Sequence, residues 1–152
     1  MYGTERILVV EDDPQVAEII CWNLFAAGYA ATLVADGLKA LRVFDEEHPA
    51  LVTLDLLIPT VSGFRLVELF KRERPQTPIL VVTALTFEEA EEAARSGADD
   101  FITKPFDPRT LVQKVDYHLR RLRLPTAVGS TSPSEPEPRE ATAERRRDFA
   151  VR

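Results

Sequence analysis

The stretch ILVVEDDP, residues 7–14, joins a buried strand to the start of a helix. Its apolar residues are continuous rather than alternating, as expected for a strand that is covered on both faces. Asp13 is an N-cap acceptor, and Pro14 favours the first position of a helix. The stretch therefore predicts a β–α unit with two further acids, Glu11 and Asp12, at the carboxyl end of its strand.

Four more apolar runs rich in Val, Ile and Leu follow along the chain, separated by segments long enough for crossover helices. The predicted strands are Arg6–Val10, Ala30–Ala35, Ala50–Leu56, Pro78–Thr83 and Asp100–Thr103. Five β–α units in a row predict an α/β fold, a doubly wound five-stranded parallel sheet with helices on both faces.

Start and end signals for helices occur between these strands. Asp36, Ser62, Thr86 and Asp107 are placed as N-caps, and Gly28 and Gly97 are placed as helix ends. Thr86 with Glu89 three residues later resembles a capping box. In the helix after Ser62, the apolar positions give one buried face, and Arg65, Lys71 and Arg72 are expected to point to water.

Length and composition predict one domain with an appendage. The chain has 152 residues, of which 45% are apolar and 29% charged, and its single cysteine, Cys21, excludes an internal disulfide. Residues 1–122 form the predicted domain. Residues 123–152, rich in proline and charge, are expected to be a flexible tail or linker.

Charge and hydropathy exclude several classes of partner. The net charge of −6 divides into −7 for residues 1–122 and +1 for residues 123–152. An acidic domain is a poor non-specific binder of nucleic acid, so none is expected to bind these residues directly. The sequence has neither an apolar run of about 18 residues nor a signal peptide, which predicts a cytoplasmic protein with no membrane contact.

Reactive residue types occur at the carboxyl ends of several predicted strands: Glu11 and Asp12 after the first, Asp55 late in the third, Thr83 at the end of the fourth and Lys104 after the fifth. Because the carboxyl ends of parallel strands meet at one edge of the sheet, these side chains are expected to converge there. Clustered carboxylates repel one another, and a set of oxygen ligands suits a hard cation such as Mg²⁺ or Mn²⁺. Asp55 is the candidate nucleophile, since a carboxylate can attack phosphorus to form an acyl phosphate. Lys104 supplies a positive charge, and Thr83 supplies a hydroxyl that can donate to a phosphoryl oxygen.

Four motifs at these positions resemble the receiver (CheY-like) domain of two-component response regulators. They are ILVVEDDP at 7–14, LDLLIPTVSG at 54–63, VVTA at 81–84 and GADDFITKPF at 97–106. The resemblance implies a flavodoxin-like fold with strand order 2-1-3-4-5. This sequence departs from the family pattern at Val61-Ser62, where the family often has Met-Asp.

The resemblance also implies roles for individual residues. Asp55 would be the phosphoacceptor, and the metal would be held by Asp12, Asp55 and the backbone carbonyl of Leu57, with Glu11 acting through water. Thr83 and Lys104 would assist the transfer at Asp55.

Signalling in the family implies a conformational switch rather than an enzyme with an external substrate. Thr83 would be the switch hydroxyl and Phe101 the aromatic residue that follows it, with the Lys104-Pro105 bond in cis. The phosphodonor would be a sensor histidine kinase, and the downstream protein is unknown. A homodimer would use the fourth helix, fifth strand and fifth helix, where the available charged residues are Arg95, Asp99, Asp100, Lys114 and Arg120.

Three alternatives compete with this interpretation. A flavin carrier of the same architecture would place a phosphate beside Glu11 and Asp12, which would repel it. A phosphatase of the haloacid-dehalogenase type needs an acid two residues after the nucleophile, where this chain has Leu57. A degenerate receiver, kept as a phosphorylation-independent interaction module, is disfavoured by the intact set of site residues. His48 and His118 are not assigned a role.

Overall fold

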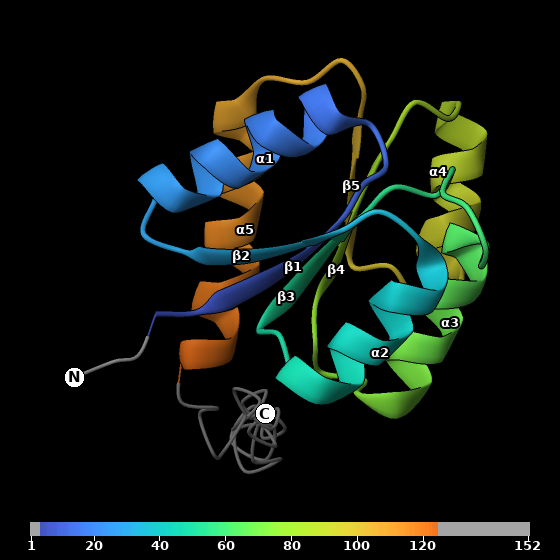
Figure 1. Ribbon diagram of the computed structural model, residues 1–152, viewed down its shortest axis with the longest axis horizontal. Helices are drawn as coiled ribbons and strands as arrows, with labels where there is room; N and C mark the ends of the chain where they lie inside the picture. Colours follow the sequence, from blue (N-terminus) through green and yellow to red (C-terminus); the bar gives the residue numbers. More distant parts are fainter. Residues whose placement is uncertain (1–3, 125–152) are drawn as a thin grey trace, which may run out of the picture.

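The computed structural model describes residues 4–124, so almost all of the predicted tail at 123–152 lies outside the described residues. Strands and helices alternate along the chain as β–α units (Figure 1). The strands are β1 (Arg6–Val10), β2 (Ala30–Val34), β3 (Leu51–Leu54), β4 (Ile79–Thr83) and β5 (Asp100–Thr103). The helices are α1 (Pro14–Ala26), α2 (Gly37–Glu47), α3 (Gly63–Glu73), α4 (Phe87–Arg95) and α5 (Pro108–Arg123).

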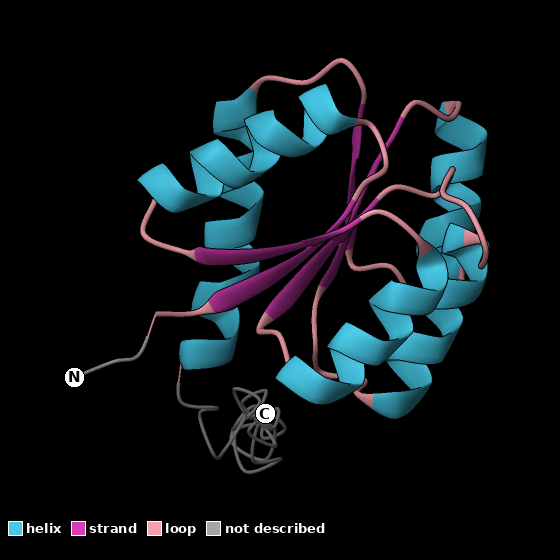
Figure 2. Ribbon diagram, viewed as in Figure 1, coloured by secondary structure: helices cyan, strands magenta, loops and turns pink. Residues whose placement is uncertain are grey.

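All strand pairs are parallel, and the strand order is β2-β1-β3-β4-β5. Figure 2 shows the sheet as a central layer with helices on both sides. Helices α1 and α5 cover one face, and α2, α3 and α4 cover the other, which confirms the predicted doubly wound fold. Within residues 4–124, no helix has both the length and the apolar character that crossing a bilayer would require.

The two faces of the sheet form two separate hydrophobic cores. Successive strand residues point to opposite faces, so Leu8 and Val10 pack under α2 and α3, while Ile7 and Val9 pack under α1 and α5. Most of these side chains are fully buried. This double coverage explains why the strands read as continuous apolar runs in the sequence.

Strand β3 is shorter than predicted, because it ends at Leu54 instead of Leu56. The backbone N–H of Asp55 still donates to the carbonyl of Val10, at 3.0 Å. The next polar contact is local, since the N–H of Leu57 donates to the Asp55 carboxylate at 2.9 Å. Such a bond between a side chain and the nearby backbone competes with the sheet ladder and turns the chain out of the strand.

Four of the predicted N-caps make the expected bonds, and one does not. The side chains of Asp13, Asp36, Thr86 and Asp107 accept backbone N–H groups at the starts of α1, α2, α4 and α5. Ser62 precedes α3 but makes no such side-chain bond. At the same helix start, a Cβ built on Gly63 would lie 2.4 Å from the Cα of Leu56. The close seating of α3 therefore depends on a glycine next to the Asp55 turn.

Lys71 is not left to water, contrary to the expectation for α3. Its ammonium donates to the carbonyls of Pro75 and Thr77 and forms an ion pair with Asp99. The other partner of Asp99 is the backbone N–H of Ile79, at 2.8 Å. The side chain of Lys71 therefore ties the end of α3 to the amino ends of β4 and β5.

Candidate functional site

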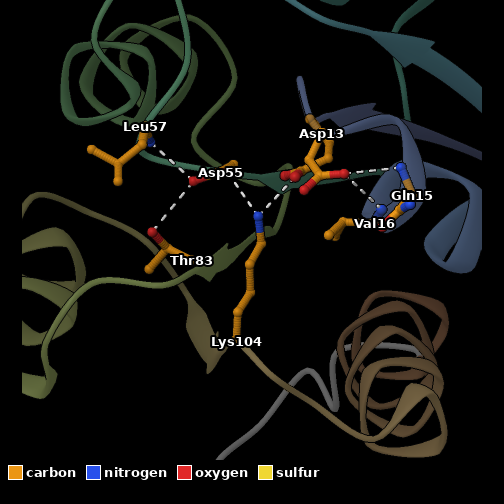
Figure 3. A network of polar contacts seen from close by, with 8 residues as sticks. Asp13, Gln15, Val16, Asp55, Leu57, Thr83 and Lys104 are labelled. Atoms are coloured by element: carbon orange, nitrogen blue, oxygen red, sulfur yellow. Dashed lines mark hydrogen bonds and ion pairs between the residues drawn. The ribbon is translucent and has the colours of Figure 1, made fainter.

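The loops after β1, β3 and β5 bring Glu11, Asp55 and Lys104 into contact at the carboxyl edge of the sheet. The Lys104 ammonium lies 2.7 Å from Oε1 of Glu11 and 2.8 Å from Oδ2 of Asp55. Figure 3 shows the lysine reaching across the site from the end of β5 toward the Asp55 carboxylate. One cation thus bridges two carboxylates that come from different strands.

The second oxygen of Asp55 faces a hydroxyl and a backbone amide. Oδ1 accepts the N–H of Leu57 at 2.9 Å and the hydroxyl of Thr83 at 3.3 Å (Figure 3). Asp55 is 6% exposed and Thr83 is fully buried. The nucleophile candidate is therefore held in a fixed direction, with its carboxylate at the base of the site.

Three acids converge beside this lysine. Carboxylate oxygens of Glu11, Asp12 and Asp55 all lie within 4.8 Å of one another. Glu11 is buried, whereas Asp12 is exposed at the rim. The residues that were expected to meet at this edge from their positions in the sequence are thus brought together by the fold.

The family model for the response regulator receiver domain matches residues 7–116. The chain belongs to this family. Phosphorylation-dependent signalling is the general function of the response regulator receiver domains, and the predicted fold and family are confirmed.

Relatives of this receiver domain are themselves response regulators. The DNA-binding dual master transcriptional regulator RpaA of Synechocystis is 36% identical over 81% of this chain and 53% of its own length. The phosphate regulon regulatory protein PhoB of Klebsiella pneumoniae is 38% identical over 81% and 55%. The beryllofluoride-activated receiver of DrrB, a Thermotoga maritima OmpR/PhoB homologue, superposes with a TM-score of 0.73 at 31% identity and covers 78% of this chain and 100% of that one. The chain spans about half the length of the curated relatives that it matches.

The electrostatics of the receiver site favour a bound cation. Burial is the main cause that raises the pKa of Glu11 to about 7, and the nearby charge of Asp55 adds to it, while Lys104 opposes it. Burial also acts to lower the pKa of Lys104, but its bonds to Asp55 and Glu11 outweigh burial and raise it. Among residues 4–124, the second oxygen of Glu11, Oε2, is buried without a hydrogen-bond partner.

The unpartnered Oε2 of Glu11 is evidence that the acidic site can hold a metal ion. A buried carboxylate oxygen without a donor is costly, and a cation or its bound water would satisfy it. The ligand atoms available nearby are oxygens, which suit Mg²⁺ better than a soft metal. The residues present therefore fit the Mg²⁺ that receiver domains bind at their acidic pocket.

The predicted switch aromatic, Phe101, lies on β5 and is partly buried against the core under α2–α4. It has an aromatic neighbour that the sequence analysis missed. The ring of Phe87 meets it edge to face at 5.9 Å between centroids, while remaining 62% exposed. The expected cis bond between Lys104 and Pro105 is present.

The charged residues considered for a dimer interface are partly engaged within the chain. Asp100 accepts the Lys114 ammonium at 2.8 Å and lies 3.0 Å from Nε2 of His118. These bonds lower the pKa of Asp100 against the opposing effect of burial. His118 is 7% exposed and thus has a partner that sequence analysis did not find. The one available signal was that Lys114 and His118 are four residues apart on one helix face.

Proposed function

We propose that Asp55 accepts a phosphoryl group from a histidine kinase and that the modification switches the surface of α4, β5 and α5. One observation supports this most strongly. The carboxylate of Asp55 has Lys104 on one oxygen and Thr83 on the other, with Glu11 and Asp12 beside it. Such an arrangement offers positioning and charge stabilisation, which are the main requirements of phosphoryl transfer.

In this proposal, the metal is held by Asp12, Asp55 and the backbone carbonyl of Leu57, with Glu11 acting through water. When bound, Mg²⁺ supplies positive charge that offsets the negative charge of the phosphoryl group during transfer. The unpartnered Oε2 of Glu11 and the convergence of three carboxylates support this assignment.

The transfer exchanges one bond to phosphorus for another. A carboxylate oxygen of Asp55 forms the new bond to phosphorus as the bond between phosphorus and the donor histidine nitrogen breaks. The Lys104 ammonium then pairs with the phosphoryl oxygens, and the Thr83 hydroxyl donates to one of them. Each of these groups already contacts the Asp55 carboxylate.

In this proposal, Thr83 and Phe101 pass the change at Asp55 to the surface. As Thr83 moves toward the phosphoryl group, Phe101 fills the space that it leaves, and the face of α4, β5 and α5 changes its binding preference. That face then forms a homodimer or binds a downstream protein. RpaA is named as a DNA-binding transcriptional regulator. In this chain, we propose that residues 1–122 act as the receiver and residues 123–152 as a tail or linker. These residues are not proposed to bind nucleic acid directly.

Incubation with acetyl phosphate and Mg²⁺, followed by intact-mass measurement, tests the proposal. We expect one added phosphoryl group that is lost on treatment with hydroxylamine, as an acyl phosphate should be. Asp55→Asn should abolish it, whereas the control Asp45→Asn, at an exposed position of α2, should not. Phosphorylation of the Asp55→Asn variant to the same extent would place the acceptor at another residue, and no phosphorylation of the parent chain would favour a degenerate receiver. Either result rejects the assignment.

A further inference from the structure

Thr60, in the loop between β3 and α3, has a backbone conformation that branched residues avoid. Its φ angle is 74°. Among residues 4–124, the other non-glycine residue with a positive φ is His48, which ends α2 in the left-handed conformation that is common at helix ends. In a β-branched residue this conformation is strained, and it persists only where surrounding contacts hold it.

The contacts that hold Thr60 come from the start of α2. Its hydroxyl accepts the backbone N–H of Leu38 at 3.0 Å and donates to Oδ1 of Asp36 at 3.5 Å. One residue earlier, the carbonyl of Pro59 accepts the N–H of Gly37 at 3.0 Å. The first N–H groups of a helix have no partner within the helix itself. The loop after β3 therefore supplies two of the acceptors that cap α2.

The start of α2 also packs closely on this loop. A Cβ built on Gly37 would lie 2.6 Å from the Cβ of Val61 and 2.7 Å from its carbonyl oxygen. At the other end of the loop, the N–H of Gly63 donates to the carbonyl of Leu56 at 3.2 Å. The loop between the acceptor turn and α3 is thus fixed by two helices, and Thr60 makes the side-chain contact to the first of them.

The loop carries a backbone group that the proposed function uses. The side chain of Leu57 is exposed, its N–H donates to the Asp55 carboxylate, and its carbonyl is the proposed metal ligand. A glycine at position 60 would adopt the left-handed backbone without strain but would offer α2 no hydroxyl. We propose that Thr60 is a positioning residue whose hydroxyl, bonded to the start of α2, holds the turn that carries the Leu57 carbonyl. This inference rests on the proposed function and names a further residue that serves its metal site.

Calorimetric titration of the unphosphorylated protein with Mg²⁺ tests the role of the hydroxyl. Thr60→Val removes the hydroxyl and keeps the size and branching of the side chain, so we expect the Kd for Mg²⁺ to rise about tenfold, the low end of the effects seen when groups that support metal ligands are removed. Thr60→Ser keeps the hydroxyl and should bind as the parent chain does. Thr60→Gly relieves the strain but lacks the hydroxyl, and it should also bind more weakly. A parental Kd in either Thr60→Val or Thr60→Gly would overturn the proposal.

A second threonine provides the matched control for a loss of helix capping alone. Thr86 is also exposed, and its hydroxyl accepts the backbone N–H of Glu89 at the start of α4. Thr86→Val should lower the midpoint of urea unfolding without metal, because a cap is lost, and should leave the Kd for Mg²⁺ unchanged. If Thr86→Val weakens Mg²⁺ binding as much as Thr60→Val does, the effect reflects helix stability instead of positioning, and the proposal is rejected.

Phosphorylation by acetyl phosphate separates this proposal from the proposed function. Thr60→Val should need about tenfold more Mg²⁺ for half of its maximal rate and should reach the parental rate when Mg²⁺ is saturating. If the parent chain is phosphorylated and Thr60→Val has the same Mg²⁺ dependence, the positioning role fails while the proposed function stands. If the parent chain is not phosphorylated, the proposed function fails, and the Mg²⁺ titration alone then decides whether Thr60 holds the metal-binding turn.

Discussion

The two edges of the sheet each hold a lysine between elements, but the polar groups around these lysines are satisfied to different degrees. At the amino edge, Lys71 bonds to two carbonyls and to Asp99, whose remaining contact is a backbone N–H. At the carboxyl edge, Lys104 faces two carboxylates, and the buried Oε2 of Glu11 has no partner among residues 4–124.

This difference separates a structural ion pair from a site prepared for a ligand. At the amino edge, no buried side-chain oxygen among residues 4–124 lacks a hydrogen-bond partner, and the Asp99 carboxylate is partly open to water. The carboxyl-edge cluster has an excess of buried negative charge, which costs stability until a cation arrives. The balance of donors and acceptors, rather than the presence of an ion pair, therefore distinguishes the candidate site from the opposite edge of the sheet.

Removing Lys104 should mainly affect phosphorylation, whereas removing Lys71 should mainly affect folding stability. Lys104→Met should slow phosphorylation by acetyl phosphate about 100-fold or more, because it removes a preorganised positive charge at the phosphoryl group. Lys71→Met should leave the phosphorylation rate unchanged and lower the free energy of unfolding by about 2 kcal/mol, because it removes the ammonium donor of two carbonyls and leaves Asp99 with only the N–H of Ile79. Intact-mass time courses and urea unfolding measure the two effects. Equal phosphorylation by both variants would contradict the distinction.

The pH dependence of metal-free stability should reveal the excess charge. The pKa of Glu11 is raised from 4.5 to about 7, so the folded protein holds this proton more tightly than the unfolded chain. The contribution of this group to the free energy of unfolding is therefore present at low pH and is lost as the pH rises from 4.5 to about 7. Glu11→Gln lacks this loss and should be more stable than the parent by an amount of order 2 kcal/mol at pH 8 in chelator.

Urea unfolding of both proteins across this pH range measures the effect, with Glu46→Gln, at an exposed position of α2, as a control. Saturating Mg²⁺ should stabilise the parent chain and leave Glu11→Gln less affected. A parent chain that is as stable as Glu11→Gln at high pH without metal would show that the excess charge is already compensated.

The smallest expected effect concerns the lifetime of the phosphoryl group. Leu57 is 59% exposed two residues beyond Asp55, and Leu85 occupies the matching position after Thr83. Neither apolar side chain can orient a water for hydrolysis, so we expect slow self-dephosphorylation. Leu57→Asn should accelerate it several-fold, since a polar group there can position the water. The control Leu122→Asn on α5 should not, and a parent half-life of seconds would refute the prediction.

The grouping of polar residues at the carboxyl edge of the sheet could be predicted from the sequence. The ion pair at the amino edge could not. Glu11, Asp55, Thr83 and Lys104 each follow an apolar run, and a parallel sheet brings such positions together whatever the details of packing. The pairing of Lys71 with Asp99 depends on how the end of α3 seats against the loop before β5. Spacing along the helix alone placed this lysine in water, which was wrong.

Other differences have the same origin in tertiary contacts. The end of β3 at Leu54 is set by a local bond to the Asp55 side chain, which apolar content does not report. The bond between His118 and Asp100 joins a helix to a strand, and the contact of Phe87 with Phe101 joins two segments that no motif connects. Chain-local patterns therefore placed the candidate site residues at one edge of the sheet, whereas the pairings between elements depend on tertiary packing.

The glycine at position 63 has a consequence for how this chain can vary. A methyl group there would meet the backbone of Leu56, the residue that follows Asp55, at 2.4 Å. Rigid main-chain atoms cannot yield as the end of a flexible side chain does, so any larger residue must tilt α3 or move the turn beside Asp55. Substitution at this position is therefore restricted by backbone packing alone, because the glycine fixes the turn that carries Asp55.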